Sequence, residues 1–205
     1  MSATSGAAAP QPRVRWGVYP SLVAAVVLVL SYVLMPQYAE TADAVGYMLR
    51  VTARVAFLFL ILAYIARPLV VMFGTGQVLV ANRRYLGLAM ALAHTVHFIF
   101  VVISVRSSGE SLELLTLLFG GLAFLLMWGM AITSNDAAVR LLGRKWKLLH
   151  IVGLHYLWLI FMQSFAGLAA FDDPYFLYAA LSAVGLAALL LRIAAWRRQR
   201  VRRAV

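Results

Sequence analysis

Four histidines are the residues of this chain best suited to chemistry. His94 and His97 lie in one strongly apolar stretch, and His150 and His155 lie in another. Ionisable side chains are costly inside a bilayer, and where they occur they usually serve a function. The chain has no cysteine, which excludes disulfides, iron–sulfur clusters and thiolate metal sites. Axial ligation of haem iron is therefore the chemistry that these imidazoles fit best.

The spacing of the histidines limits how they can pair. His94 and His97 are three residues apart and share a helix face. His150 and His155 are five apart, about 140° around a helix, so they cannot both face one partner. At 1.5 Å of rise per residue, His94 and His155 come closest in level, whereas Gln163 is level with His97. Spacing alone therefore does not select a pair of axial ligands. The alternative for each histidine is that it binds no iron and only forms a hydrogen bond to a neighbouring helix.

Two arginines in another apolar stretch are further candidates. Arg50 and Arg54 are four residues apart on one helix face. Arg54 could neutralise a haem propionate, or both side chains could extend to the lipid headgroups. Both interpretations are kept for Arg54, and the second is favoured for Arg50.

The composition indicates that lipid is the solvent of this chain. Of its 205 residues, 64% are hydrophobic and 12% charged, with a mean hydropathy of +0.89. A soluble domain is roughly 45–50% apolar and about 25% charged. A net charge of +11 on a soluble protein would indicate nucleic-acid binding. Here the basic residues flank apolar runs, so a membrane-surface role is predicted and a nucleic-acid partner is not.

Six apolar stretches are long enough to cross about 30 Å of hydrocarbon, which takes roughly 20 helical residues. The predicted fold is therefore all-α, a polytopic bundle of six transmembrane helices. A shorter apolar segment, Pro68–Val80, is predicted to be interfacial or an extension of the second helix. The six predicted spans are Trp16–Met35, Tyr47–Ala66, Tyr85–Val105, Leu112–Ile132, Leu148–Ala169 and Pro174–Ala195.

Charge sets the predicted orientation. Fifteen of the eighteen Lys and Arg residues fall at the two termini or in the loops on the same side, and these residues favour the cytoplasmic side. Both termini are therefore predicted to be cytoplasmic, in a multi-pass protein of the bacterial inner membrane. The predicted layout is a disordered tail (1–15), one membrane domain (16–195) and a basic tail (196–205). The other side carries Glu40, Asp43, Glu110, Glu113, Asp172, Asp173 and Arg106.

Two motifs resemble a known family. One is Arg-Arg-Tyr-Leu-Gly-Leu at 83–88, and the other is Arg-Lys-Trp-Lys-Leu-Leu-His at 144–150. They resemble the entrances to two helices of the ferric reductase-like transmembrane domain family, which includes haem-binding membrane subunits serving periplasmic methionine sulfoxide reductase. The resemblance covers about 45–195 and implies that His97, fourteen residues after the first arginine, and His150 ligate haem iron. His94 and His155 follow as further candidates.

The sequence also departs from that family. The family often has a second histidine thirteen residues after the first on the fifth helix, and here that position is Gln163. The flavin and nicotinamide domains of larger members are missing, and no Gly-rich dinucleotide fingerprint occurs.

The resemblance implies one or two b-type haems, with quinone as a further possible ligand. It implies electron entry from quinol or a separate flavoprotein, and exit to a periplasmic redox partner. The chain would then be the membrane subunit of an oxidoreductase, with no catalytic residue of its own. The alternative is a non-redox scaffold, small transporter or assembly partner. Discontinuous helices would favour that alternative, but Pro68 and Pro174 lie only at the ends of predicted spans.

Overall fold

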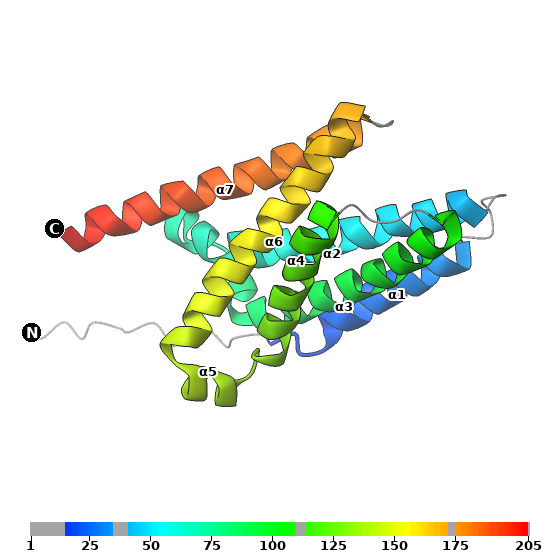
Figure 1. Cartoon of the computed structure of the whole chain (residues 1–205). Coiled ribbons are helices and arrows are strands. Elements are labelled where there is room, and N and C mark those ends of the chain that lie inside the picture. Colours follow the sequence, from blue (N-terminus) through cyan, green and yellow to red (C-terminus); the bar gives the residue numbers. More distant parts are fainter. Residues whose placement is uncertain (1–14, 35–40, 110–113, 172–174, 205) are drawn as a thin grey trace, which may run out of the picture.

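The computed structural model describes residues 15–34, 41–109, 114–171 and 175–204, and helices account for nearly all of them (Figure 1). The predicted all-α class is confirmed. The predicted disordered tail lies, except for Arg15, outside the described residues. The helices are α1 (Tyr19–Leu34), α2 (Thr41–Phe73), α3 (Gln77–Ser108), α4 (Leu114–Ile132), α5 (Asp136–Leu142), α6 (Arg144–Phe171) and α7 (Tyr175–Ala204).

Five of these helices, α2, α3, α4, α6 and α7, are long and apolar enough to cross a membrane. They correspond to five of the six predicted spans. The remaining predicted span forms α1, which has 16 residues and a length of about 24 Å at 1.5 Å per residue. This length is shorter than the roughly 30 Å hydrocarbon core. Six complete crossings therefore stay a prediction.

The segment Pro68–Val80 is not a seventh span. Helix α2 continues through Pro68 to Phe73, and α3 begins at Gln77. The turn between them uses Gly74 and Gly76 at φ values of 70° and 87°, which glycine adopts without the steric cost of a Cβ. Of the two predicted alternatives, the extension of the second helix is therefore correct for 68–73, whereas 77–80 begin α3. The turn also lets α3 start eight residues before the predicted Tyr85.

Helix α2 is at the centre of the packing. It lies against α3 along much of its length and also contacts α1, α6 and α7, whereas α4 packs mainly on α6. The buried core includes Phe57, Leu60 and Tyr64 of α2 together with Leu86 of α3 and Phe161 of α6. Many large apolar side chains of α1 and α4 are exposed, as expected where lipid is the solvent.

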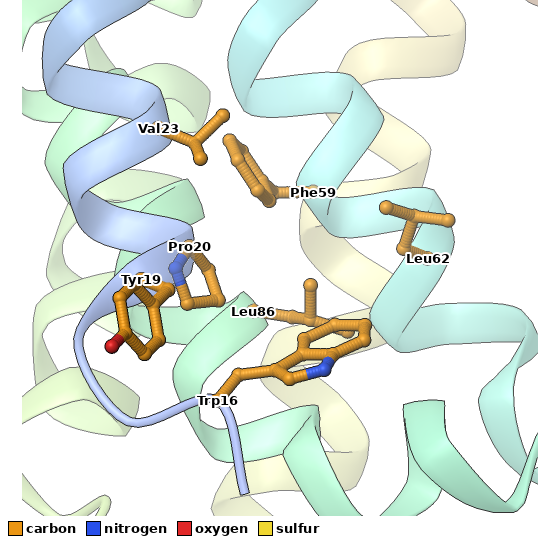
Figure 2. Close-up of a pocket in the computed structure, with 7 residues that line it drawn as sticks. All are labelled: Trp16, Tyr19, Pro20, Val23, Phe59, Leu62 and Leu86. Carbon is orange, nitrogen blue, oxygen red and sulfur yellow. The ribbon is translucent and has the colours of Figure 1, made fainter. Parts of the chain in front are cut away.

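The start of α1 is fixed to α3 by a polar contact. The backbone N–H of Trp16 donates to Oδ1 of Asn82 at 2.6 Å, and Asn82 is fully buried. Beside this contact, an apolar pocket of about 290 Å³ lies between α1, α2 and α3 (Figure 2). It has no charged side chain in its lining, which consists of Trp16, Tyr19, Pro20, Val23, Phe59, Leu62 and Leu86.

Basic residues gather at one end of the bundle, which we call the basic end. There the α2–α3 turn, α5, the start of α6 and the end of α7 lie towards the same side of the molecule (Figure 1). At this end Arg84 forms an exposed ion pair with Asp136 of α5. The hydrogen bond from Arg84, and its positive charge, hold the pKa of this carboxyl below its usual value. The basic end is defined by Arg67, Arg83, Arg84, Arg140, Arg144, Lys145, Lys147, Arg192 and Arg198.

Candidate functional site

His97 points from α3 towards α2. Its Nδ1 atom lies 3.2 Å from the backbone carbonyl of Leu49 and 3.0 Å from Oγ1 of Thr52. Thr52 is fully buried, and its hydroxyl also lies 2.7 Å from the carbonyl of Met48. Two polar groups of one helix turn, the Leu49 carbonyl and the Thr52 hydroxyl, therefore contact one imidazole nitrogen.

This arrangement fixes the tautomer of His97. A carbonyl oxygen can only accept a hydrogen bond, so Nδ1 must carry the proton that Leu49 accepts. The Thr52 hydroxyl can then donate to Met48 while its oxygen also receives the His97 proton. With the proton on Nδ1, Nε2 of the neutral ring keeps a free lone pair. Metal-bound histidines commonly have this arrangement, with the other ring nitrogen bonded to a carbonyl.

His94 lies one turn before His97 and faces α6. The two imidazoles stack with centroids 5.4 Å apart, and the His94 ring lies 5.4 Å from that of Phe161 on α6. Its Nδ1 atom is buried and has no hydrogen-bond partner within the described part of the chain. The predicted shared face of His94 and His97 is therefore present.

His150 lies near the start of α6. Its Nδ1 atom donates to the carbonyl of Trp146 at 3.0 Å, and its ring stacks on the Trp146 ring at 3.9 Å. The Trp146 indole donates in turn to the carbonyl of Thr133 at 2.8 Å, which fixes it against the end of α4. Nε2 of His150 is buried and has no partner among the described residues, so it is free to bind a ligand.

His155 points in a different direction from His150. Its Nδ1 atom bonds to the carbonyl of Ile151 at 2.7 Å, and its ring meets the ring of Tyr64 on α2 edge-on at 5.5 Å. His150 is instead fixed by Trp146 on the α4 side. The two side chains thus diverge, as their five-residue spacing predicts.

The structure does not bring the two histidine pairs together. No Cα atom in the described part of α3 lies within 8 Å of one in α6. His97 contacts α2 at Leu49 and Thr52, whereas His155 contacts α2 at Tyr64, at least twelve residues further along. At 1.5 Å per residue the difference is about 18 Å along α2. The histidines are therefore spread through the depth of the bundle, and no group of three or more His, Asp or Glu able to hold a metal ion occurs among the described residues.

The two arginines of the first half of α2 differ. Arg54 turns inward: its guanidinium carbon lies 5.5 Å from the centroid of the Tyr178 ring on α7, and Nη2 lies 3.4 Å from the Tyr178 hydroxyl. Nε of Arg54 is buried without a partner in the described segments. Arg50 is exposed and lies beside Gly46, one turn towards the start of the helix.

The sequence did not predict the contacts of two polar residues, Thr52 and Arg192. Thr52 is one β-branched residue within an apolar stretch, and its contact with His97 spans 45 residues of sequence. Arg192 falls among the basic residues near the C-terminal end of the sequence, yet it reaches the backbone of α2 at Tyr64. No sequence signal links Thr52 to His97. For Arg192 the sequence does offer a signal. The residue lies five residues before the other arginines of the C-terminal end, within the apolar part of the helix.

Fold and site define a multi-pass α-helical membrane protein whose polar groups include four histidines within its membrane helices. The chain is similar to proteins named protein-methionine-sulfoxide reductase heme-binding subunit MsrQ. It is 28% identical to one from Klebsiella pneumoniae over 55% of this chain, and 27% identical to one from Salmonella arizonae over 77%. The predicted resemblance to these haem-binding membrane subunits is confirmed.

The similarity covers only part of the length of these relatives. The chain spans 63% of the length of that Klebsiella relative, less than two thirds, and 82% of the Salmonella relative. No protein-family model matches the chain, and no solved structure matches it.

Proposed function

We propose that this chain is a b-type haem-binding membrane subunit that carries electrons across the bacterial inner membrane. Electrons enter from quinol or a separate flavoprotein at the basic end. They leave at the opposite end to a redox partner. By similarity to the MsrQ proteins, that partner is an enzyme of the methionine sulfoxide reductase type.

The observation that carries this proposal is the state of the histidine nitrogens. Nδ1 of His97, His150 and His155 each bonds to a backbone carbonyl, which leaves Nε2 of each ring free as a ligand atom. For His150 that atom is also buried without a partner among the described residues. A buried imidazole nitrogen with no partner costs free energy, and a haem iron would remove that cost. The residues present therefore fit the cofactor.

His97 and His150 are the proposed axial ligands, with His94 and His155 as the further candidates. His97 faces the first half of α2 and His150 lies near the start of α6, so we assign them to separate haems. His94 and His97 lie one turn apart on one helix face, so they cannot approach one iron from opposite sides. Arg54 is proposed to face a propionate of the haem near His97.

When bound, haem b supplies one-electron chemistry through its iron. The residues of this chain hold and orient that group. Leu49 and Thr52 fix the His97 ring, and Trp146 fixes the His150 ring. Because the histidines are spread through the depth of the bundle, two such sites would shorten the distance that an electron must cross between the two faces.

Haem content and spectra of the purified chain test this function. We expect a reduced-minus-oxidised spectrum with a b-type α-band. We also expect His97→Ala and His150→Ala each to lose roughly half of the haem per chain, because each removes an axial ligand of one site. Gln163→Ala is the matched control, because Gln163 is exposed on α6 and should leave the haem content unchanged. Circular dichroism checks that each variant keeps its helices.

Two results would contradict the proposal. A purified chain without a b-type spectrum favours the non-redox scaffold. Full haem retention in both histidine variants removes His97 and His150 from the site.

A further inference from the structure

Two arginines from different helices converge on one turn of α2 near the basic end. Arg83 of α3 donates from Nε to the carbonyl of Ala63 at 3.1 Å. Arg192 of α7 donates from Nη1 to the carbonyl of Tyr64 at 2.8 Å, and its guanidinium carbon lies 4.5 Å above the Tyr64 ring. Both side chains are partly buried. They lie close enough for the positive charge of Arg192 to act on Arg83.

Pro68 explains why Arg192 can bind here. In an α-helix the carbonyl of Tyr64 would accept from the N–H of residue 68. Residue 68 is proline, which has no N–H, so this carbonyl lacks its helical donor. Arg192 supplies the missing hydrogen bond from α7. The sequence of α2 therefore creates a fixed position for a guanidinium group.

Within the described residues, no acidic side chain pairs with Arg83 or Arg192. Two cations in a low-dielectric region repel each other and need a counter-charge, which the neutral carbonyls do not provide. The only ion pair within the described residues joins Arg84 to Asp136. The other six Asp and Glu residues lie at 40–43, 110–113 and 172–173 of the sequence, none of them within ten residues of Arg83 or Arg192 along the chain.

The neighbourhood of the pair indicates which anion it takes. The ring of Tyr64 contacts His155, and the charge of Arg83 acts on His150, whose Nε2 has no partner in the described part of the chain. The Tyr64 hydroxyl is likewise buried and without a partner there. A guanidinium fork matches a planar carboxylate. A haem bound through His150 would carry two carboxylates on one edge of its ring.

We propose that Arg83 and Arg192 bind the two propionate carboxylates of the haem that His150 holds at the basic end. This inference rests on the proposed haem-binding function and adds the residues that hold the anionic edge of the cofactor. An anionic lipid headgroup is the competing occupant.

Binding of haemin and of haemin dimethyl ester separates these cases. The ester keeps the iron and loses both carboxylate charges. The full-length chain, produced under haem limitation and placed in zwitterionic nanodiscs, is titrated with each ligand in a His97→Ala background, so that the site at the basic end is measured. We expect haemin to bind about tenfold more tightly than the ester, or more, because charged hydrogen bonds are lost with the ester.

Arginine variants then locate the effect. In Arg83→Gln and Arg192→Gln the preference for haemin should fall towards equal binding, whereas Arg192→Lys should keep part of it. Arg198→Gln is the matched control. Arg198 also lies on α7 and donates to a backbone carbonyl of α2, that of Met72 at 2.7 Å, but it is exposed. The control should keep the full preference.

Each other outcome has a definite meaning. Equal binding of haemin and ester to the chain with both arginines overturns the propionate assignment, even if every glutamine variant fails to fold. If native mass spectrometry then finds an anionic lipid that is lost in the arginine variants, the lipid headgroup is the occupant. Failure of both haemin and ester to bind in the His97→Ala background removes the haem site at the basic end, and failure of both to bind the chain that retains His97 contradicts the haem-binding function itself.

Discussion

At the scale of single residues, the important feature is the hydrogen bond that Nδ1 of each candidate histidine makes, because Nε2 is the proposed ligand atom. Nδ1 of His97 has a carbonyl and a threonine hydroxyl as partners, whereas Nδ1 of His150 and of His155 has a carbonyl of its own helix. Such bonds orient the ring and raise the basicity of the ligating nitrogen. His97 should therefore be the most strongly oriented of these ligands.

Replacing Thr52 tests this difference. Thr52→Val removes the hydroxyl while keeping the side-chain shape, which weakens the Nδ1 hydrogen bond and makes His97 a less basic ligand. A less basic ligand favours ferrous iron, so the reduction potential of the His97 haem should rise, on the order of tens of millivolts. Spectroelectrochemical titration measures this shift.

Thr95→Val serves as the control for Thr52→Val. The Thr95 hydroxyl bonds to the carbonyl of Ala91 within α3 at 2.7 Å, two residues from His97, and the substitution should leave the potential unchanged. An equal shift in both variants would mean that Thr52 has no special relation to the haem.

Sequence alone identified the candidate residues by type but not their partners. A histidine in an apolar stretch is conspicuous because its burial has a cost. Thr52 carries no such signal, since threonine often bonds to its own helix backbone in apolar helices. The partners of Arg192 depend on which helix lies beside α7, which residue type does not reveal.

At the scale of helices, small residues decide how closely α6 and α7 approach. Trp158 of α6 donates to the carbonyl of Gly185 on α7 at 2.9 Å. A Cβ at Gly185 would collide with Sδ of Met162 and lie 3.4 Å from the ring of Phe57. Close approach at small residues is a common way for membrane helices to pack.

Two glycine variants should therefore change stability in opposite directions. Gly185→Ala adds a methyl group to a filled interface and should destabilise the fold by about 1–3 kcal/mol. Gly167→Ala, on α6 where nothing lies within 4 Å of the added carbon, should stabilise by up to about 1 kcal/mol through helix propensity. Melting temperatures in one detergent compare the two. A higher melting temperature for Gly185→Ala would contradict this packing.

Helix boundaries were only partly predictable. Length and hydropathy located α2, α3, α4, α6 and α7 because a bilayer demands long apolar runs. The short α5 was not predicted, although Asn135 and Asp136 are typical of a helix start: Oδ1 of Asn135 accepts from the N–H of Ala138 at 2.7 Å. A long α3 was also missed, because the apolar segment Pro68–Val80 was predicted to be interfacial or an extension of the second helix, whereas its last residues begin α3.

At the scale of the whole molecule, charge is distributed unevenly between the two ends. The basic end carries many Lys and Arg residues, among them Arg84, Arg140 and Arg192. The other end of the bundle is formed by the ends of α3 and α6 and the start of α4 (Figure 1). Lys and Arg favour the cytoplasm, so the basic end is predicted to face it. The chain lacks cysteine, which makes a direct test simple.

Single cysteines at exposed positions test the orientation. Ser107→Cys lies at the end of α3 and Ala137→Cys lies on α5 at the basic end, and both residues are exposed. With the outer membrane permeabilised, an impermeant maleimide should label the cysteine at 107 directly and the one at 137 only after the inner membrane is opened. The reverse pattern would mean that the orientation is inverted.

The arrangement of helices was the least predictable feature. Buried and lipid-facing residues of a membrane helix are both apolar, so periodicity does not show which face meets which neighbour. The separation of the α3 backbone from that of α6 and the central place of α2 are therefore structural results. They also explain why the histidines do not form the pairs that spacing alone allows.

The length of α7 has a further consequence. Its 30 residues extend about 45 Å, beyond a hydrocarbon core of about 30 Å. Arg197, Arg200 and Arg202 on the final turns therefore lie among or beyond the phosphates. Each such charge gains about 1 kcal/mol near an anionic surface. The last turns of this helix are therefore expected to act as an anchor whose strength grows with the anionic-lipid content of the leaflet and weakens as ionic strength rises.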